Sequence, residues 1–311
     1  MSRLVVIVGP TAIGKSRLAI RLAQSIDGEI VSADSRQVYR YMDIGTAKPS
    51  PQERTLVPHH LIDVVDPDQD FSLALYQELA HRAIADIEKR GKVPILVGGS
   101  GLYVRAVIGG FAIPQIPPDY ELRHSLEEKA AREGGQALYQ ELEQMDPEAA
   151  KRTDPRNIRR VIRAIEVCRA SGMPFSQLQK SSPPYRALVV GLTTDREELY
   201  RRIDNRVDSM MEQELVQEVE GLLQRGYSLD LPSMSGLGYK QVGKYLQGQL
   251  TLDEAVQQIK FETHRFARHQ YAWFRLKDKS INWFDVRNGA EEYIHSLVLG
   301  FVDKVGNYEI R

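Results

Sequence analysis

The chain has 311 residues, of which 42% are hydrophobic and 27% charged, and its formal net charge is −1 at pH 7. This length allows roughly two domains with sizeable cores, and the near-neutral charge excludes a protein that binds polyanions with its whole surface. No apolar run approaches the roughly 20 residues that span a bilayer, so we expect no membrane partner. The single cysteine, Cys168, excludes an internal disulfide and a cysteine-based zinc site, and it favours a reducing, cytoplasmic location.

The first predicted elements are a strand, a glycine-rich loop and a helix. Residues 4–8 form an apolar run suited to a buried strand, and residues 17–23 have helical spacing. The segment GPTAIGKS between them fits the P-loop pattern G-x-x-x-x-G-K-[ST], whose backbone amides hold phosphate oxygens. The loop alone does not identify the phosphate: a nucleoside triphosphate is the default, and any diphosphate would fit. The residues predicted to contact it are Gly9, Pro10, Thr11, Ala12, Ile13, Gly14, Lys15 and Ser16, with Ser16 also predicted to hold Mg²⁺.

A second strand over residues 29–33 ends at Asp34, and a third over 94–97 is followed by the glycine-rich segment 98–101. A helix over 73–89 separates them. This alternation predicts an α/β fold, a doubly wound parallel sheet like that of P-loop NTPases, with ligands at the carboxyl ends of its strands. Asp34 would lie at such an end, either as a Mg²⁺ ligand or as a general base. We favour the base, because no other hydrophobic strand ends in a clear second acid.

Proline clusters near residues 113–118 and 183–184 bracket a block with only helical patterns, at 120–132, 135–145 and 157–170. Such brackets are typical of an inserted subdomain. We therefore expect a catalytic core formed by 1–117 and 184–311, with an all-helical insertion at 118–183. In the core, we expect a strand over 187–192, a long helix over 196–225 capped by Asp195, further helices to about 275, an edge strand at 281–284 and a last helix over 290–305.

Clusters of cations occur in both predicted parts. Arg156, Arg159, Arg160 and Arg163 recur at i, i+3, i+4 and i+7 with few matching acids, which favours an RNA-backbone contact over a solvated basic face. In the core, Arg202 and Arg206 are one helical turn apart and could clamp a diphosphate, with ion pairs to Asp204 or Asp208 as the alternative. Residues 263–275 interleave cations with aromatic side chains, a mixture that either stacks unpaired bases or simply contributes aromatic residues to a core.

Taken together, the motifs resemble those of the bacterial tRNA dimethylallyltransferases, and they follow one another in order over nearly the whole chain. They are GPTAIGKS (9–16), SADSRQVY (32–39), MDIGTAKP (42–49), GGSGLY (98–103), DPRNIRRVIRAIEV (154–167), RRIDNRVDSMM (201–211), SMSGLGYKQV (233–242) and RFARHQYAWFR (265–275).

The resemblance implies Mg²⁺-dependent transfer of a dimethylallyl group from dimethylallyl diphosphate to N6 of the adenosine next to the anticodon. It implies that the helical insertion grips the anticodon stem-loop of tRNA, and we expect the protein to act as a monomer. The catalytic residues that it implies are Asp34 as the base, Arg206 on the diphosphate, and Ser100 in place of the family's usual threonine. The implied tRNA contacts are Asp34, Ser35, Arg36, Gln37, Ser100, Arg123, Arg159, Arg160, Arg163, Gly238, Tyr239, Lys240, Arg268, Gln270, Trp273 and Arg275.

Three other functions fit the P-loop. A prenyltransferase that acts on free AMP, ADP or ATP is the nearest, although a mononucleotide needs no basic helical insertion. A small-molecule kinase would consume ATP at the same loop, and a P-loop RNA-binding or switch protein would bind without turnover. The sequence leaves open whether ATP also binds the loop.

Overall fold

The computed structural model describes residues 2–110, 113–114, 116–178 and 182–303. Its contacts form two compact units, one made of Met1–Ser72, Tyr76–Ile108 and Pro184–Arg311, the other of Leu73–Leu75 and Gly109–Pro183. The main segment of the helical unit thus begins at Gly109, whereas the sequence predicted that the insertion begins at residue 118, after the proline cluster. Residues 304–305, at the end of the last predicted helix, lie outside the described residues, as do Gln115 and 179–181 at the two proline clusters.

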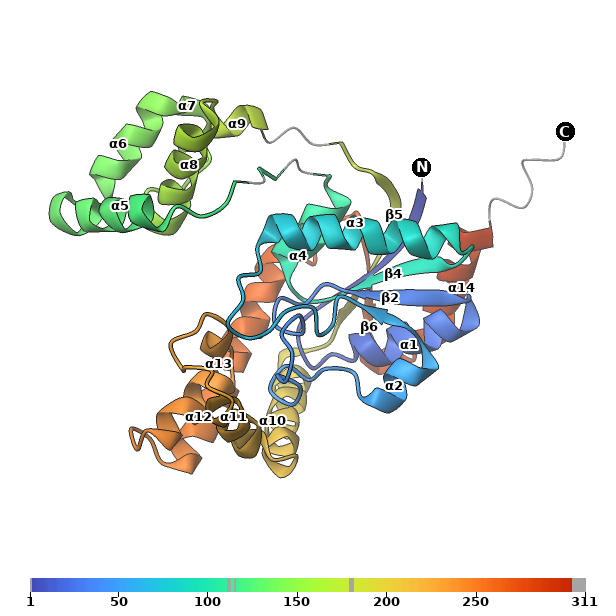
Figure 1. The fold of residues 1–311 in the computed structure, drawn as a ribbon. Coiled ribbons are helices and arrows are strands. Elements are labelled where there is room, and N and C mark those ends of the chain that lie inside the picture. Colours follow the sequence, from blue (N-terminus) through green and yellow to red (C-terminus); the bar gives the residue numbers. More distant parts are fainter. Residues whose placement is uncertain (1, 111–112, 115, 179–181, 304–311) are drawn as a thin grey trace, which may run out of the picture. The chain divides into compact units, whose positions relative to one another are not determined.

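The first unit contains a six-stranded sheet in the order β3-β2-β4-β1-β5-β6, and every strand pair is parallel. This confirms the predicted parallel sheet. The chain passes from β1 over β4 to β2 and later returns to β5 on the other side of β1, so the sheet is doubly wound (Figure 1). The strands are β1 (Ser2–Val8), β2 (Gly28–Ser32), β3 (His59–His60), β4 (Val93–Val97), β5 (Tyr185–Thr193) and β6 (Ile281–Asp285).

The central strand β1 is apolar without alternation because both of its faces are covered. Leu4 to Val8 have no exposed surface at all, as expected for a parallel strand with helices on either side. Figure 1 shows helix α3 along one face of the sheet and α1 along the other. The helices beside the sheet are α1 (Lys15–Ser25), α2 (Pro51–Leu56), α3 (Leu73–Lys89), α4 (Gly101–Ile108) and α14 (Glu291–Asp303). The sequence did not predict α2, whose six residues are fixed by a capping box between Ser50 and Glu53.

A second core lies among the helices that follow β5. Asp195 caps α10 as predicted, since its side chain accepts a hydrogen bond from the backbone N–H of Glu198 (2.8 Å). The prediction of one helix over 196–225 was wrong, because the chain turns at Glu214 with a left-handed φ of 71°. That turn lets Leu215 and Val219 pack against the helices that follow. The helices are α10 (Arg196–Glu212), α11 (Leu215–Gln224), α12 (Tyr239–Leu246) and α13 (Leu252–Trp273), with a short 3-10 turn at Ser233–Ser235.

The second unit is all helical and has a core of its own. Leu126, Leu138, Leu142 and Ile165 are at most 3% exposed and pack together. A buried carboxylate, Glu166, lies beside this core. The helices are α5 (Tyr120–Glu133), α6 (Gly135–Met145), α7 (Pro147–Lys151), α8 (Ile158–Ser171) and α9 (Phe175–Leu178). In the part of the chain that the structure describes, no helix combines the length and the apolar character needed to cross a bilayer.

Candidate active site

The carboxyl ends of β1, β2 and β4 bring together the three segments that the sequence singled out. The segments that follow β2 and β4 touch, because Gly98 has no side chain: a Cβ there would lie 2.0 Å from the carbonyl oxygen of Ala33. Backbone hydrogen bonds join them, from Ala33 N to Val97 O (2.7 Å) and from Ser100 N to Ala33 O (3.3 Å). This close approach places Asp34 and Ser100 beside each other, as the parallel sheet predicted.

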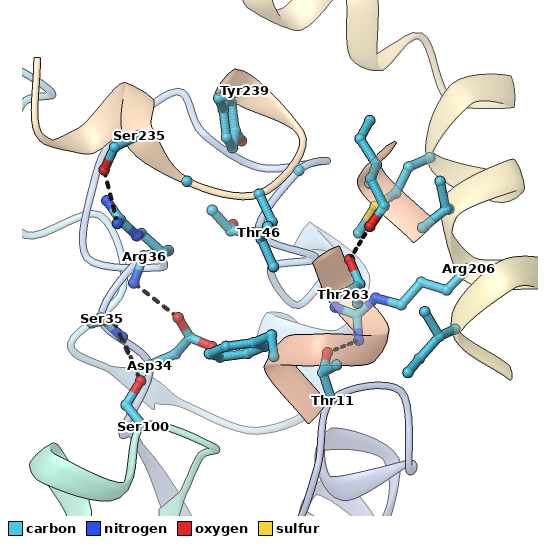
Figure 2. Close-up of a pocket in the computed structure, with 18 residues that line it drawn as sticks. Thr11, Asp34, Ser35, Arg36, Thr46, Ser100, Arg206, Ser235, Tyr239 and Thr263 are labelled. Atoms are coloured by element: carbon cyan, nitrogen blue, oxygen red, sulfur yellow. Dashed lines mark hydrogen bonds between the residues drawn. The ribbon is translucent and has the colours of Figure 1, made fainter. Parts of the chain in front are cut away.

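These segments line a pocket in the first unit with a volume of about 280 Å³. Figure 2 shows Asp34, Thr11 and Arg206 facing the same cavity from three different elements. The pocket is close in size to the smaller ligand sites of proteins. Its lining residues are Thr11, Asp34, Ser35, Arg36, Gly45, Thr46, Ser100, Ile203, Arg206, Val207, Met210, Ser235, Gly236, Leu237, Tyr239, Ile259, Thr263 and Phe266.

Asp34 is held in place by the turn that follows it. Its Oδ1 accepts a hydrogen bond from the backbone N–H of Arg36 (2.8 Å), and the hydroxyl oxygen of Ser100 accepts one from the backbone N–H of Ser35 (3.1 Å). Ser100 therefore fixes the backbone next to Asp34 (Figure 2). A serine hydroxyl is sufficient for this bond.

Two cations of the site, Lys15 and Arg206, are bonded to neutral oxygen atoms. Arg206 donates a hydrogen bond to Thr11 Oγ1 (3.3 Å), and Lys15 Nζ donates one to Pro10 O (2.7 Å). Burial and the nearby charge of Arg206 lower the pKa of Lys15 to about 7, although the carboxylate of Asp34 acts in the opposite direction. Among the described residues, no carboxylate forms an ion pair with either side chain. A bound anion would relieve the repulsion between them.

The predicted clamp of two arginines is not formed. Arg202 donates to Glu198 (2.6 Å) on its own helix, so only Arg206 of the pair reaches the pocket. The loop itself also presents fewer free amides than the motif predicts. The backbone N–H of Thr11 donates to Gln270 Oε1 (2.8 Å), while Gln270 Nε2 donates to Gly99 O (3.0 Å).

Gln270 was predicted to contact tRNA, but in the structure its side chain is bonded within the protein. It is 4% exposed, and both ends of its amide are bonded to backbone groups, so it joins the P-loop to the loop after β4. The side chains of Arg36 and Gln37 also form hydrogen bonds within the protein. Arg36 donates to Pro232 O (2.8 Å), and Gln37 donates to Ala47 O (3.2 Å). These three side chains shape the site from within.

The other predicted tRNA residues of the first unit differ in exposure. Gly238 and Tyr239 are buried, and Tyr239 lines the pocket instead of the outer surface. Lys240, Arg268 and Arg275 are exposed, with Arg268 donating to Tyr200 Oη (2.6 Å). The indole ring of Trp273 is partly exposed and lies 5.3 Å from the guanidinium carbon of Arg105. The predicted mixture of cations and aromatic rings is therefore present at the carboxyl end of α13.

An apolar wall of the pocket was missed by the sequence analysis. Ile203, Val207 and Met210 face it from α10, and Ile259 and Phe266 face it from α13. The spacing of the first three, at i, i+4 and i+7, is that of any helix face turned to a core. Only the tertiary structure distinguishes a face that lines a pocket from one that is packed.

The sequence predicted that the arginines of the helical unit share one helix face with few matching acids, but two of those four arginines form ion pairs. Arg163 and Arg123 both bind the buried carboxylate of Glu166, at 2.5 and 2.9 Å. Burial alone would raise the pKa of Glu166, but the hydrogen bonds from Arg123 and Arg163 lower it. Arg156 pairs with Asp154 (2.9 Å). Arg159 and Arg160 are exposed, and among the described residues no acid forms an ion pair with them.

Ser16 carries a hydroxyl oxygen that can bind a divalent cation, and it is exposed in the first turn of α1, beside the loop. The described residues contain no group of three His, Cys, Asp or Glu side chains arranged to hold a metal ion. Mg²⁺ commonly binds through one or two protein groups together with substrate phosphates and waters. A hydroxyl beside a phosphate loop fits that coordination.

Comparison with known proteins identifies the family. The model of the family described as IPP transferase matches residues 37–277, and that described as isopentenyl transferase matches residues 2–63. The chain belongs to the IPP transferase family. This membership confirms the resemblance on which the residue assignments above are based.

Individual relatives agree with the family assignment. The chain is 57% identical over 276 residues to the tRNA dimethylallyltransferase of Roseiflexus castenholzii. The aligned residues cover 88% of this chain and 90% of that protein. Its fold is similar to that of the full-length tRNA isopentenylpyrophosphate transferase from Bacillus halodurans, with a TM-score of 0.73, 43% identity and 98% of each chain covered. A eukaryotic dimethylallyltransferase acting on tRNA gives a TM-score of 0.83 at 26% identity, covering 99% of this chain and 80% of that one.

Proposed function

We propose that this chain transfers a dimethylallyl group from dimethylallyl diphosphate to N6 of the adenosine next to the anticodon of tRNA. Its family and its relatives, which are named for this reaction, support the proposal. The pocket supports it independently, because its lining combines cations with an apolar wall.

The observation that carries the proposal is the pair of cations, Lys15 and Arg206, that form no ion pair with any acid in the described part of the chain. They lie next to the wall formed by Val207, Met210 and Phe266. A diphosphate would neutralise the cations, and a five-carbon prenyl chain would cover the apolar surface. A nucleoside triphosphate would also satisfy the cations, but its ribose and base carry polar groups that this wall would leave without partners. Dimethylallyl diphosphate has both parts in one small molecule, so it matches the pocket better.

In the proposed reaction, the bond between C1 of the prenyl group and the diphosphate oxygen breaks as the bond from N6 of adenosine to C1 forms. Negative charge grows on the leaving diphosphate, where Arg206, Lys15 and the amides of the P-loop would stabilise it. Asp34 would hydrogen-bond to N6–H, orient the amine and accept its proton. The hydrogen bond from Arg36 N to Oδ1 fixes one oxygen of Asp34 for this task.

We also propose Mg²⁺ as the cofactor, with Ser16 as its protein ligand beside the diphosphate. When bound, the ion would neutralise part of the charge on the leaving group. Ser16 would hold the ion from the first turn of α1, and the ammonium group of Lys15 would bind the diphosphate.

On the RNA side, Arg159 and Arg160 of the helical unit, and Lys240, Arg268 and Arg275 of the catalytic unit, are the exposed cations that we propose contact the anticodon stem-loop. An adenine must leave its stack to reach Asp34, which in a single-stranded loop costs only a few kcal/mol. We propose that the protein acts as a monomer in the cytoplasm, where tRNA is processed.

The test is to incubate the protein with Mg²⁺ and radiolabelled dimethylallyl diphosphate, in parallel with unmodified tRNA, AMP and ATP. Label in tRNA at the adenosine next to the anticodon is the expected result. Label in AMP or ATP would indicate a nucleotide prenyltransferase. Hydrolysis or transfer of the ATP γ-phosphate would indicate a kinase, and tRNA binding without turnover would indicate a binding protein. Each of the last three results would overturn the proposal.

The role of Asp34 is tested by Asp34→Asn, which keeps the shape and removes the base. The single-turnover rate should fall by about 10²-fold or more, the range for loss of a general base, while tRNA affinity changes little. Asp253→Asn, an exposed site on α13, is the matched control. A variant with near-normal turnover would exclude Asp34 as the base.

A further inference from the structure

The carboxylate of Glu218, on α11, accepts hydrogen bonds from three consecutive backbone amides of the MDIGTAKP segment. Its Oε2 accepts from Asp43 N (2.9 Å) and Ile44 N (2.7 Å), and its Oε1 accepts from Gly45 N (3.2 Å). Successive backbone amides turned to one point make an anion site, which here is filled by a side chain of the protein itself.

The same carboxylate holds the side chain of Tyr239, whose hydroxyl donates to Oε1 at 2.6 Å. Tyr239 is 1% exposed, and burial together with the charge of Glu218 raises the pKa of its hydroxyl well above the usual value. The tyrosine therefore stays a neutral donor to Glu218 at physiological pH.

The two groups that Glu218 joins also touch each other. A Cβ on Gly45 would lie 2.5 Å from the ring of Tyr239, so the ring is packed directly on the backbone of the loop. Gly45, Thr46 and Tyr239 all line the pocket. Figure 2 shows Thr46 and Tyr239 on the side away from Thr11 of the P-loop. This wall is built from two segments almost 200 residues apart in sequence, and Glu218 lies behind it, outside the pocket lining.

We infer that Glu218 is a positioning residue for the acceptor base: its carboxylate fixes the 43–46 loop and the ring of Tyr239 as one rigid wall against which the adenine is held. The inference rests on the proposed function, which assigns the P-loop side of the pocket to the diphosphate and leaves this side for the base. Four hydrogen bonds to one charged group make this wall strong, since bonds to an ionised acceptor are roughly twice as strong as neutral ones.

The test is Glu218→Gln in the full chain. The amide has nearly the same size, but its NH₂ group faces backbone N–H donors and cannot accept from them. With tRNA as acceptor, kcat should fall about tenfold or more, corresponding to the loss of about one charged hydrogen bond. The KM for dimethylallyl diphosphate and the Kd for pyrophosphate should stay within about twofold of wild type, since the P-loop is untouched.

Glu220→Gln is the matched control, because Glu220 lies on the same helix and is exposed. It should behave as the wild type in every assay. Equal kcat values for Glu218→Gln and Glu220→Gln would overturn the inference, and so would a parallel loss of pyrophosphate affinity in Glu218→Gln, which would mean a general loss of structure.

Hydrogen exchange gives a measurement that does not depend on activity. In the wild type, the amides of residues 43–45 should be protected, and in Glu218→Gln their exchange should rise while that of β1 and β4 is unchanged. Tyr239→Phe removes only the hydroxyl, so it should lower kcat by a smaller factor and leave the three amides protected. Unchanged exchange at 43–45 in Glu218→Gln would overturn the inference, whether or not the wild type modifies tRNA. Failure of the wild type to modify tRNA would count against the proposed function alone.

Discussion

At the scale of single residues, the ammonium group of Lys15 makes the site sensitive to pH. Its pKa of about 7 means that the free protein holds it half charged at neutral pH, because burial and Arg206 disfavour the charged form. A bound diphosphate would favour the charged form and raise this pKa. Binding should therefore take up protons above pH 7 and less so at lower pH, where Lys15 already carries its charge.

We predict that pyrophosphate binding at pH 7 takes up about half a proton through Lys15, in line with its pKa of about 7. Titration calorimetry in buffers of different ionisation enthalpy measures this number. Lys15→Met should lose that contribution and leave only the proton exchange of pyrophosphate itself. The same proton count in wild type and Lys15→Met would contradict the prediction.

A second residue, Glu29, makes stability rather than binding depend on pH. It is 1% exposed on β2, with both carboxylate oxygens bonded to Arg90 and one also to His60 at 2.7 Å. The hydrogen bonds from Arg90 lower its pKa to about 2, against the effect of burial. Since the folded pKa lies below the unfolded one, the stabilisation is complete above about pH 4.5 and is lost as the pH falls towards 2.

Glu29→Gln should therefore reduce the free energy of unfolding at pH 7 by about 1.5–3 kcal/mol, the usual contribution of a hydrogen bond to a charged group. Its stability should also fall less steeply than that of the wild type between pH 5 and pH 3, a range set by the acid linkage of a carboxylate. Urea unfolding at several pH values provides the measurement, with the exposed Glu220→Gln as control. Parallel pH profiles of wild type and Glu29→Gln would be inconsistent with this account.

At the scale of elements, α13 links the phosphate side of the site to an exposed surface. Gln270 joins it to the P-loop and to Gly99, Phe266 lines the pocket, and Trp273 and Arg275 lie at its end. The segment 263–275 therefore contains a buried amide that joins two loops of the site as well as exposed cations and an exposed aromatic ring.

We predict that Gln270→Ala weakens pyrophosphate binding about tenfold, the effect of losing roughly one hydrogen bond that orders the loop. Calorimetry measures the Kd. Gln258→Ala, at an exposed position of the same helix, should leave it unchanged. If both variants bound pyrophosphate equally well, the bridge through Gln270 would have no role in shaping the loop.

Helix α8 of the helical unit presents two arginines with no acidic partner among the described residues, Arg159 and Arg160. Replacing both by alanine should reduce the slope of log K against log salt for tRNA binding by about 1.4–1.8, because each lost phosphate contact contributes about 0.7–0.9. Arg156→Ala should change the slope less, since Asp154 already neutralises that arginine. Filter binding or fluorescence anisotropy at several salt concentrations measures the slope, and an unaltered slope in the double variant would exclude these contacts.

At the scale of the whole molecule, the two units have separate cores, so we expect two unfolding transitions instead of one. Pyrophosphate at 100 times its Kd should stabilise only the unit that contains the P-loop, by about 2.7 kcal/mol. Leu138→Ala, in the core of the helical unit, should lower the other transition by about 2–5 kcal/mol without altering the Kd. Differential scanning calorimetry separates these effects, and a single transition shifted by both changes would show that the units unfold together.

The sequence by itself determined much of this protein. The parallel sheet, the P-loop between β1 and α1, Asp34 after β2 and the family all follow from local patterns. Apolar runs, glycine spacing and cap residues act over a few residues, so they can be read without a structure. For the same reason, the ends of α3 and α6 were predicted correctly.

Only the tertiary structure decided what each polar side chain does. Arg123 and Arg163 were predicted from the sequence to contact tRNA, and the structure shows that they also neutralise the buried Glu166. The amide of Gln270, predicted for the same role, joins two loops of the site. Glu218 carries no motif signal at all, and it gains its role from a turn at Glu214 that directs α11 toward residues 43–45. Partners distant in sequence decide whether a charged group is exposed or bonded, and this depends on the folded arrangement of the chain.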